Sequence, residues 1–252
     1  LDSFLGIPIR HKGEAIGMIA LANRPCGFDE TLVTQLEPLT TALGTLIHAR
    51  NLEDERSRME RVLRFNAEHD FLTKLPNRSE FERCAAEVIV ASERQNTGFC
   101  LLLFDLNGFK QVNDTLGHSL GDELLKMVSG LLCNQVRKGD TVARLGGDEF
   151  VILLPHITHS EDAIRVAKNV IQCLGDVVHL EGANLTITPS IGIALYPNDG
   201  LDAETLLRNA DIAMYRAKAQ GRNSYQCYTA DMGELASEVL RLEMALRQAI
   251  EQ

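Results

Sequence analysis

Residues 141–154, TVARLGGDEFVILL, place two acidic side chains at a point of unusual backbone freedom. Two apolar runs flank a short polar centre, which is the pattern of paired strands closed by a tight turn. Gly146 and Gly147 permit positive φ and close approach of a ligand to the main chain, while Asp148 and Glu149 could reach a metal or a metal-bound phosphate. A hairpin whose acids are merely hydrated turn residues would have the same sequence, so other segments must decide between a functional and a structural turn.

A further acid closes an apolar run upstream. Residues 99–106, FCLLLFDL, read as a strand buried on both faces, and Asp105 lies near its end. A carboxylate in such a place needs a partner because its burial is costly. Asp105 is therefore a candidate to act with Asp148, although it could simply cap the strand.

The elements that must position these acids follow from the apolar spacing. Asn77 or Ser79 can cap a helix, and the order after that point is helix, strand, helix, strand, strand, helix, strand, helix, strand. This order predicts an α/β (α+β) domain whose antiparallel-centred sheet has helices on a face. The expected segments after the cap are 99–106, 108–130, 142–145, 150–154, 160–174, 185–196 and 201–219.

The first 69 residues have a different pattern. Residues 4–9 and 15–21 read as a hairpin, and leucines at positions 32, 36, 39, 43 and 46 form one stripe of a helix. Residues 49–69 are highly charged with a thin apolar seam at Leu52, Met59, Val62 and Leu63. Such a seam favours a two-stranded coiled coil, a helical stalk that pairs protomers, over a single linker helix.

Composition narrows the class of protein. A net charge of -10 and few basic residues argue against a protein that coats nucleic acid, but a nucleotide carrying its own magnesium remains compatible. No apolar run approaches the roughly 20 residues that cross a bilayer, so we expect no membrane contact in this fragment and a cytoplasmic location. Six cysteines without a C-x-x-C pair indicate reduced thiols, and a chain that begins at Leu1 looks like an excised piece.

Five motifs, in order and spacing, make residues 70–228 resemble the GGDEF family of diguanylate cyclases. They are D-x-L-T-x-L-x-N-R at 70–78, F-D-L-N-G-F-K at 104–110, N-D-x-x-G-H-x-x-G-D at 113–122, R-x-G-G-D-E-F at 144–150 and A-D-x-A-M-Y-x-A-K-x-x-G-R-N at 210–223. The resemblance implies synthesis of cyclic di-GMP from two GTP molecules. It also implies a ferredoxin-like sheet similar to the palm of nucleotide polymerases.

Phosphodiester formation requires neutralisation of charge on the attacking and the leaving oxygens, and two Mg²⁺ ions held by carboxylates would do this, with Mn²⁺ as a substitute. The resemblance implies Asp105, Asp148 and the Leu106 carbonyl as ligands. Glu149 would bind the second ion or take the hydroxyl proton, and the two roles stay open.

The resemblance also implies the substrate contacts. The residues implied to bind phosphate are Lys110, Lys218 and Arg222, and those implied to recognise guanine are Asn113 and Asp122. Main-chain contacts are implied at Gly146 and Gly147. Asn107 and Phe109 line the same loop in the family, and His118 is expected to be structural. Each domain would hold one GTP, so the reaction needs a homodimer. Phe71 and Lys74 depart from the usual Pro and Gly of the first motif, which affects a scaffold turn only.

Arg137 and Asp140 match the family's R-x-x-D site, at which the product cyclic di-GMP would inhibit the enzyme; an ordinary charged turn is the alternative. The predicted division is therefore 1–48 as the end of a GAF-like sensory domain, 49–69 as the stalk, 70–229 as the GGDEF domain, and 230–252 as an amphipathic helix toward an EAL-like domain. A GTP-binding regulator that makes no product is the rival function, and a cyclic di-GMP receptor is a third.

Overall fold

The computed structural model describes residues 2–157, 159–175, 178–180, 183–185 and 187–235. The chain forms two compact units, Leu1–Ala67 and Glu68–Gln252, and each is considered by itself. The division lies close to the expected start of the GGDEF domain. The residues expected to lead toward an EAL-like domain are helical at 230–235, and the remainder lies outside the described residues.

The first unit is a hairpin on a long helix. Strands β1 (Phe4–His11) and β2 (Glu14–Ala22) are antiparallel, as predicted, and α1 spans Glu30–Glu68 without a break at residue 48. Ile7 and Ile9 are buried, and a Cβ added at Gly44 would lie 2.2 Å from the Arg10 carbonyl oxygen, so strand and helix backbones touch here. The assignment to a GAF domain stays a prediction.

The apolar positions of the predicted stalk are exposed on α1. Leu52, Met59, Val62 and Leu63 each have more than half of their side-chain surface in solvent. A thin exposed seam of this kind is what a paired helix would cover. The coiled coil therefore remains a prediction with an available surface.

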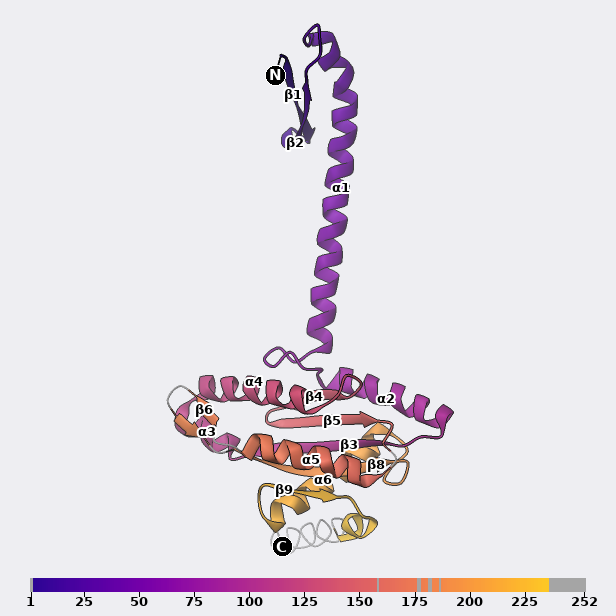
Figure 1. Ribbon diagram of the computed structural model, residues 1–252, viewed down its shortest axis with the longest axis vertical. Helices are drawn as coiled ribbons and strands as arrows, with labels where there is room; N and C mark the ends of the chain where they lie inside the picture. The colour runs from indigo at the N-terminus through magenta and orange to yellow at the C-terminus, as the bar shows by residue number, and fades with distance from the viewer. Residues whose placement is uncertain (1, 158, 176–177, 181–182, 186, 236–252) are drawn as a thin grey trace, which may run out of the picture. The chain divides into compact units, whose positions relative to one another are not determined.

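The second unit has a mixed five-stranded sheet in the order β4-β5-β3-β8-β9 (Figure 1). Every neighbouring pair is antiparallel except β8 and β9, which are parallel. The strands are β3 (Phe99–Asn107), β4 (Thr141–Gly146), β5 (Glu149–Pro155), β8 (Thr188–Tyr196) and β9 (Ser224–Cys227), and β6 (Val178–Leu180) with β7 (Ala183–Leu185) form a separate hairpin. This mixed α+β fold confirms the predicted class.

Among the described residues of this unit the named helices are α2 (Arg78–Gln95), α3 (Phe109–Leu116), α4 (His118–Gln135), α5 (Ser160–Gly175) and α6 (Ala203–Gln220), in addition to the helical residues 230–235. The expected order holds with two additions. The helix predicted after Gly108 is divided at Gly117, which has φ of 90°, and the β6–β7 hairpin was not foreseen.

Two apolar clusters hold the helices to the two faces of the sheet, because side chains alternate along β3. Leu102 and Phe104 face one way and pack with α4 and α5, whereas Leu101 and Leu103 face the other way and pack with α2 and α6. Burial on both faces explains the continuous apolar run, and it leaves Asp105 as the polar residue at the end of a buried strand.

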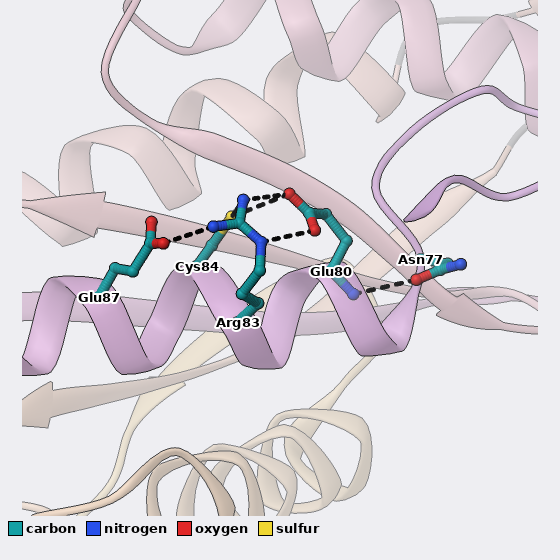
Figure 2. A network of polar contacts seen from close by, with 5 residues as sticks. All are labelled: Asn77, Glu80, Arg83, Cys84 and Glu87. Carbon is teal, nitrogen blue, oxygen red and sulfur yellow. Dashed lines mark hydrogen bonds and ion pairs between the residues drawn. The ribbon is translucent and has the colours of Figure 1, made fainter. Parts of the chain in front are cut away.

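Helix α2 begins at the predicted cap. The Asn77 side chain accepts a hydrogen bond from the Glu80 backbone N–H (3.0 Å), and Arg83 bridges the carboxylates of Glu80 and Glu87 on the same helix (Figure 2). The cap satisfies a free N–H of the first turn, and exposed ion pairs of this spacing add only a few tenths of a kcal/mol. Residues 69–76, which precede this cap, are here named the entrance turn.

The cysteines differ from one another in burial. Cys100 is fully buried, whereas Cys26 and Cys133 are exposed, so the expectation of core thiols is correct for only part of the set. Within the described ranges no cysteine forms a disulfide. A helix able to span a membrane is likewise not found among the described residues.

Candidate active site

The signature turn joins β4 to β5 and has the geometry that its glycines predict. Gly146 (φ 145°) and Gly147 (φ 51°) both have positive φ, which L side chains rarely adopt. Gly146 pairs with Glu149 across the turn, and the strand register shifts between Arg144 and Gly146. Asp148 therefore lies at the tip, presented by two residues that only glycine suits.

Arg144 ties this turn to the entrance turn. Its Nε and Nη2 donate to the Gly147 carbonyl oxygen (3.0 and 2.7 Å), and its Nη1 donates to Asp70 Oδ1 (2.9 Å). Its backbone N–H donates to the Pro76 carbonyl oxygen (2.9 Å). The guanidinium is 9% exposed, so it acts as an internal brace of the signature turn.

Asp70 is prepared to receive that guanidinium. Burial would raise the pKa of the Asp70 carboxyl, but hydrogen bonds from the Thr73 hydroxyl (2.6 Å) and backbone N–H (2.8 Å), together with Arg144, outweigh it and hold the pKa below its usual value. The carboxylate is therefore charged over the whole neutral range.

The two acids predicted to act together are neighbours. Asp105 pairs in register with Glu149 on β5, the residue after Asp148. Burial and then the negative charge of Asp105 raise the pKa of Asp148, against the opposing influence of Lys218 and Arg144. Segments more than 40 residues apart in the sequence thus place two carboxylates within electrostatic range at one end of the sheet.

Lys218 completes this cluster from α6. Its Nζ forms an ion pair with Asp105 Oδ2, while Asp105 Oδ1 is buried and accepts no hydrogen bond from the described residues. Helix α6 packs so closely on β8 that a Cβ added at Gly192 would lie 1.8 Å from the Ala210 carbonyl oxygen. This close packing keeps the helix that carries Lys218 against the sheet.

The donor set fits a divalent cation. Among the described residues no three His, Cys, Asp or Glu side chains are close enough to enclose a metal by themselves. Mg²⁺ takes only one or two protein carboxylates and completes its shell with water and substrate phosphate. A buried carboxylate oxygen without a partner beside a second carboxylate suits that habit, so Asp105 and Asp148 would be the residues to hold such an ion.

The predicted guanine readers lie on the α3–α4 corner. Asn113 is half-buried on α3 and its Oδ1 is buried without a hydrogen-bond partner, whereas Asp122 is exposed on α4. A Cβ at Gly121 would lie 1.9 Å from that same Oδ1. At this corner the Asn113 side chain therefore packs against Gly121, the residue before Asp122.

The remaining phosphate-binding candidates are exposed. Lys110 is exposed near the start of α3, and Arg222 lines a cavity of about 340 Å³ with Asn107, Gly108 and Thr188. Their chemistry suits a triphosphate, but only Lys218 among the predicted cations contacts an active-site acid in the described part of the chain. His118 is also exposed.

The R-x-x-D pair forms at the opposite end of β4. Arg137 Nε donates to Asp140 Oδ1 (3.1 Å), its backbone N–H donates to Oδ2 (3.0 Å), and its Nη2 donates to the Pro155 carbonyl oxygen (2.7 Å). Arg137, Asp140 and His156 line two cavities of about 390 and 400 Å³. The pair is thus assembled next to space that a ligand could use.

Two features were missed from the sequence. Asp70 and Arg144 belong to motifs that were recognised, yet the ion pair between them was not predicted. The available signal was that one motif supplies an acid and another an arginine. Asp211, two turns before Lys218 on α6, lies within electrostatic range of both Lys218 and Asp105. Its i, i+7 spacing from Lys218 could have suggested this.

Comparison with known proteins now decides the family. Residues 67–224 match the profile described as "Diguanylate cyclase, GGDEF domain". This chain belongs to the GGDEF family of diguanylate cyclases. The GGDEF domain therefore occupies most of the second unit, and its name derives from the signature turn described above.

Relatives carry this domain within longer proteins. The chain is 41% identical over 220 residues to MucR of Pseudomonas aeruginosa, a bifunctional diguanylate cyclase/cyclic di-GMP phosphodiesterase, covering 87% of this chain and 31% of MucR. It is 36% identical to the diguanylate cyclase TpbB of the same organism, covering 79% and 45%. The chain thus spans about a third to a half of these proteins.

Solved structures agree with the fold. The GGDEF domain of TpbB from Pseudomonas aeruginosa is 37% identical with a TM-score of 0.65, covering 67% of this chain and 99% of that one. The coiled coil and GGDEF domain of DgcB from Caulobacter crescentus, solved in complex with c-di-GMP, is 26% identical with a TM-score of 0.66, covering 74% and 100%. The mixed α+β architecture is common to all three.

Proposed function

We propose that this GGDEF domain is a diguanylate cyclase that joins two GTP molecules into cyclic di-GMP and releases two pyrophosphates. The observation that carries the proposal is the cluster at the end of β3: Asp105 with a buried oxygen lacking a partner, Asp148 with a raised pKa, and Lys218 between α6 and the acids. A carboxyl group with a raised pKa beside a second acid and a lysine is an arrangement that active sites use.

Asp105, Asp148 and the Leu106 carbonyl would hold two Mg²⁺ ions, or Mn²⁺ in their place. The ions supply neutralisation of charge on the attacking and leaving oxygens of the transfer. Glu149 either assists with the second ion or accepts the proton of the ribose 3′-hydroxyl. Lys218, already drawn to Asp105, is placed to exchange that carboxylate for a triphosphate oxygen when substrate arrives.

The other substrate contacts follow from charge and hydrogen-bond type. Lys110 and Arg222 would neutralise the triphosphate, and the main chain at Gly146 and Gly147 permits its close approach. Asn113 and Asp122 would read the guanine edge, since a carboxylate accepts from guanine N–H groups that adenine lacks.

The reaction needs two domains because each site holds one GTP, so we infer that the active form is a homodimer. The exposed apolar seam of α1 supports this: its burial between two helices would stabilise the pair. A solved relative, DgcB of Caulobacter crescentus, likewise has a coiled coil together with its GGDEF domain. Pairing would set the separation of the half-sites.

A direct test measures product. Incubation with GTP and Mg²⁺ is expected to release pyrophosphate and cyclic di-GMP, and Asp148→Asn, which keeps size and removes charge, is expected to reduce the rate at least about 100-fold. Glu93→Gln, an exposed acid on α2, serves as the matched control and should keep the wild-type rate. An Asp148→Asn protein with wild-type turnover would reject the proposed site.

The rival function is a GTP-binding module that makes no product and regulates an EAL domain. Two observations favour keeping it: Lys218 occupies one oxygen of a proposed metal ligand, and the chain is 38% identical to part of NbdA, a cyclic di-GMP phosphodiesterase of Pseudomonas aeruginosa. A dimeric protein that binds GTP and Mg²⁺ yet releases no pyrophosphate would favour this rival. Binding of cyclic di-GMP without GTP binding would favour a receptor.

A further inference from the structure

Gly121 stands where a helix would ordinarily have a better residue. It is the fourth residue of α4 and is buried, although glycine is the poorest helix former after proline. A Cβ at this position would lie 1.9 Å from Asn113 Oδ1, 3.0 Å from Asn113 Cγ and 3.4 Å from Phe109 Cζ. The side chain of Asn113 therefore occupies the space that any other residue at position 121 would need.

The Asn113 side chain lies in an environment that is unfavourable for its polar oxygen. Its Oδ1 is buried and has no hydrogen-bond partner among the described residues, while its backbone carbonyl is used by the Gly117 N–H (3.0 Å) at the end of α3. Buried polar atoms without partners are rare, and each calls for an explanation. Because a carboxamide is planar, the placement of Oδ1 in the space beside Gly121 also sets the direction of the Asn113 side-chain NH2 group.

We propose that Gly121 is a specificity-determining positioning residue, which sets the Asn113 carboxamide in the orientation that reads guanine. The proposal rests on the proposed function, because it presupposes that Asn113 and Asp122 contact the base. Gly121 directly precedes Asp122 in α4. The same turn of this helix therefore carries Asp122 and, at Gly121, leaves the space that the Asn113 side chain occupies.

The second glycine of α4 provides a matched control. A Cβ at Gly130 meets nothing within 4 Å, and the residue is exposed on the same helix. Gly130→Ala should therefore improve helix propensity without moving a neighbour. Gly121→Ala makes the same chemical change but must displace Asn113.

The experiment measures dissociation constants for GTP and ATP by equilibrium dialysis, with circular dichroism to verify folding. Gly121→Ala should weaken GTP binding about tenfold or more and leave ATP binding unchanged, as should Asn113→Ala. The double variant should lose no more than either single variant, because both remove one interaction. Gly130→Ala should retain the wild-type ratio of the two constants.

Other outcomes separate this inference from the proposed function. A folded Gly121→Ala protein that keeps the wild-type GTP to ATP ratio would overturn the inference while leaving the function intact. Equal binding of GTP and ATP by the wild type would instead reject the function and, with it, the role in specificity. The denaturation midpoints add an independent readout: Asn113→Ala should restore part of the stability that Gly121→Ala loses, and a lack of such coupling counts against the steric contact itself.

Discussion

Strand β4 has an arginine–aspartate pair at each end, and the two pairs differ chiefly in the burial of the arginine. Arg144 is 9% exposed and bonds to Asp70, which is 74 residues away and itself 16% exposed. Arg137 is 61% exposed and pairs with Asp140, which is 4% exposed and lies only three residues along the chain. One pair joins distant segments through a buried arginine, whereas the other closes a short turn through an arginine that is largely in solvent.

The difference teaches that the same two residue types serve different purposes according to their burial. A buried guanidinium with all its partners in the fold cannot leave them for a ligand, so Arg144 is structural even though it is part of the signature motif. An exposed guanidinium exchanges partners at little cost, so Arg137 is available to bind a nucleotide. Three experiments test this contrast, and a fourth tests the acid at the tip of the turn that Arg144 supports.

Arg144→Ala is expected to have the largest effect. It leaves the Asp70 carboxylate without its charged partner and removes the bonds to the Gly147 carbonyl, so the free energy of unfolding should fall by roughly 3–5 kcal/mol. Urea denaturation measures the loss. A decrease below about 1 kcal/mol would show that the two arginines do not differ as their burial indicates.

Asp70→Asn should have the next largest effect and should reveal its origin through pH. The folded pKa of Asp70 is lowered, so the carboxylate stabilises the protein above the unfolded value near 3.9, and this contribution disappears as the pH falls through the folded pKa. The variant should be less stable than the wild type by about 1–3 kcal/mol at pH 7. The gap should close in acid, and a gap independent of pH would contradict the ionic role.

Asp148→Asn should instead stabilise the protein without metal. The folded pKa of Asp148 is raised, chiefly by burial, so its ionised form is disfavoured by folding. In EDTA the variant should gain on the order of 1 kcal/mol or less at pH 7, a small value because the group is partly hydrated. The gain should vanish below the unfolded pKa. Equal stability of the two proteins at neutral pH would contradict this expectation. It would show that folding does not disfavour the ionised Asp148 carboxylate when no cation is bound.

Arg137→Ala should change stability least, by less than about 1 kcal/mol, since the arginine side chain is 61% exposed and the buried Asp140 carboxylate keeps the backbone N–H of residue 137 as a partner. It should nevertheless weaken binding of cyclic di-GMP at least about tenfold in calorimetry, because it removes the bidentate donor of the proposed inhibitory site. Arg165→Ala, which removes another exposed arginine paired at i, i+3, is a control for the stability measurement. Wild-type affinity for cyclic di-GMP would reject the inhibitory assignment.

Sequence alone predicted the parts of the site that depend on local pattern. The apolar run of β3 and the glycine turn both have a period and a punctuation that can be read directly, and they locate Asp105 and Asp148 at one end of the sheet. The break at Gly117 was missed because a single glycine within a helical pattern does not announce a corner.

Partnerships across long chain distances were not predictable in the same way. The bond between Arg144 and Asp70, and that between Lys218 and Asp105, depend on tertiary packing, to which neither periodicity nor propensity refers. The Gly121 contact with Asn113 belongs to the same class, because its cause is a shape visible only when α3 and α4 meet.

β4 is an outer strand of the sheet, and the hydrogen bond from the Arg144 N–H to the Pro76 carbonyl shields that flank. Outer strands with free N–H groups recruit other chains, so the entrance turn also serves as a guard against intermolecular pairing. A shortened version of the domain should therefore start before residue 69. A version that starts at α2 would lose the guard and be prone to precipitate during purification, for reasons unrelated to nucleotide chemistry.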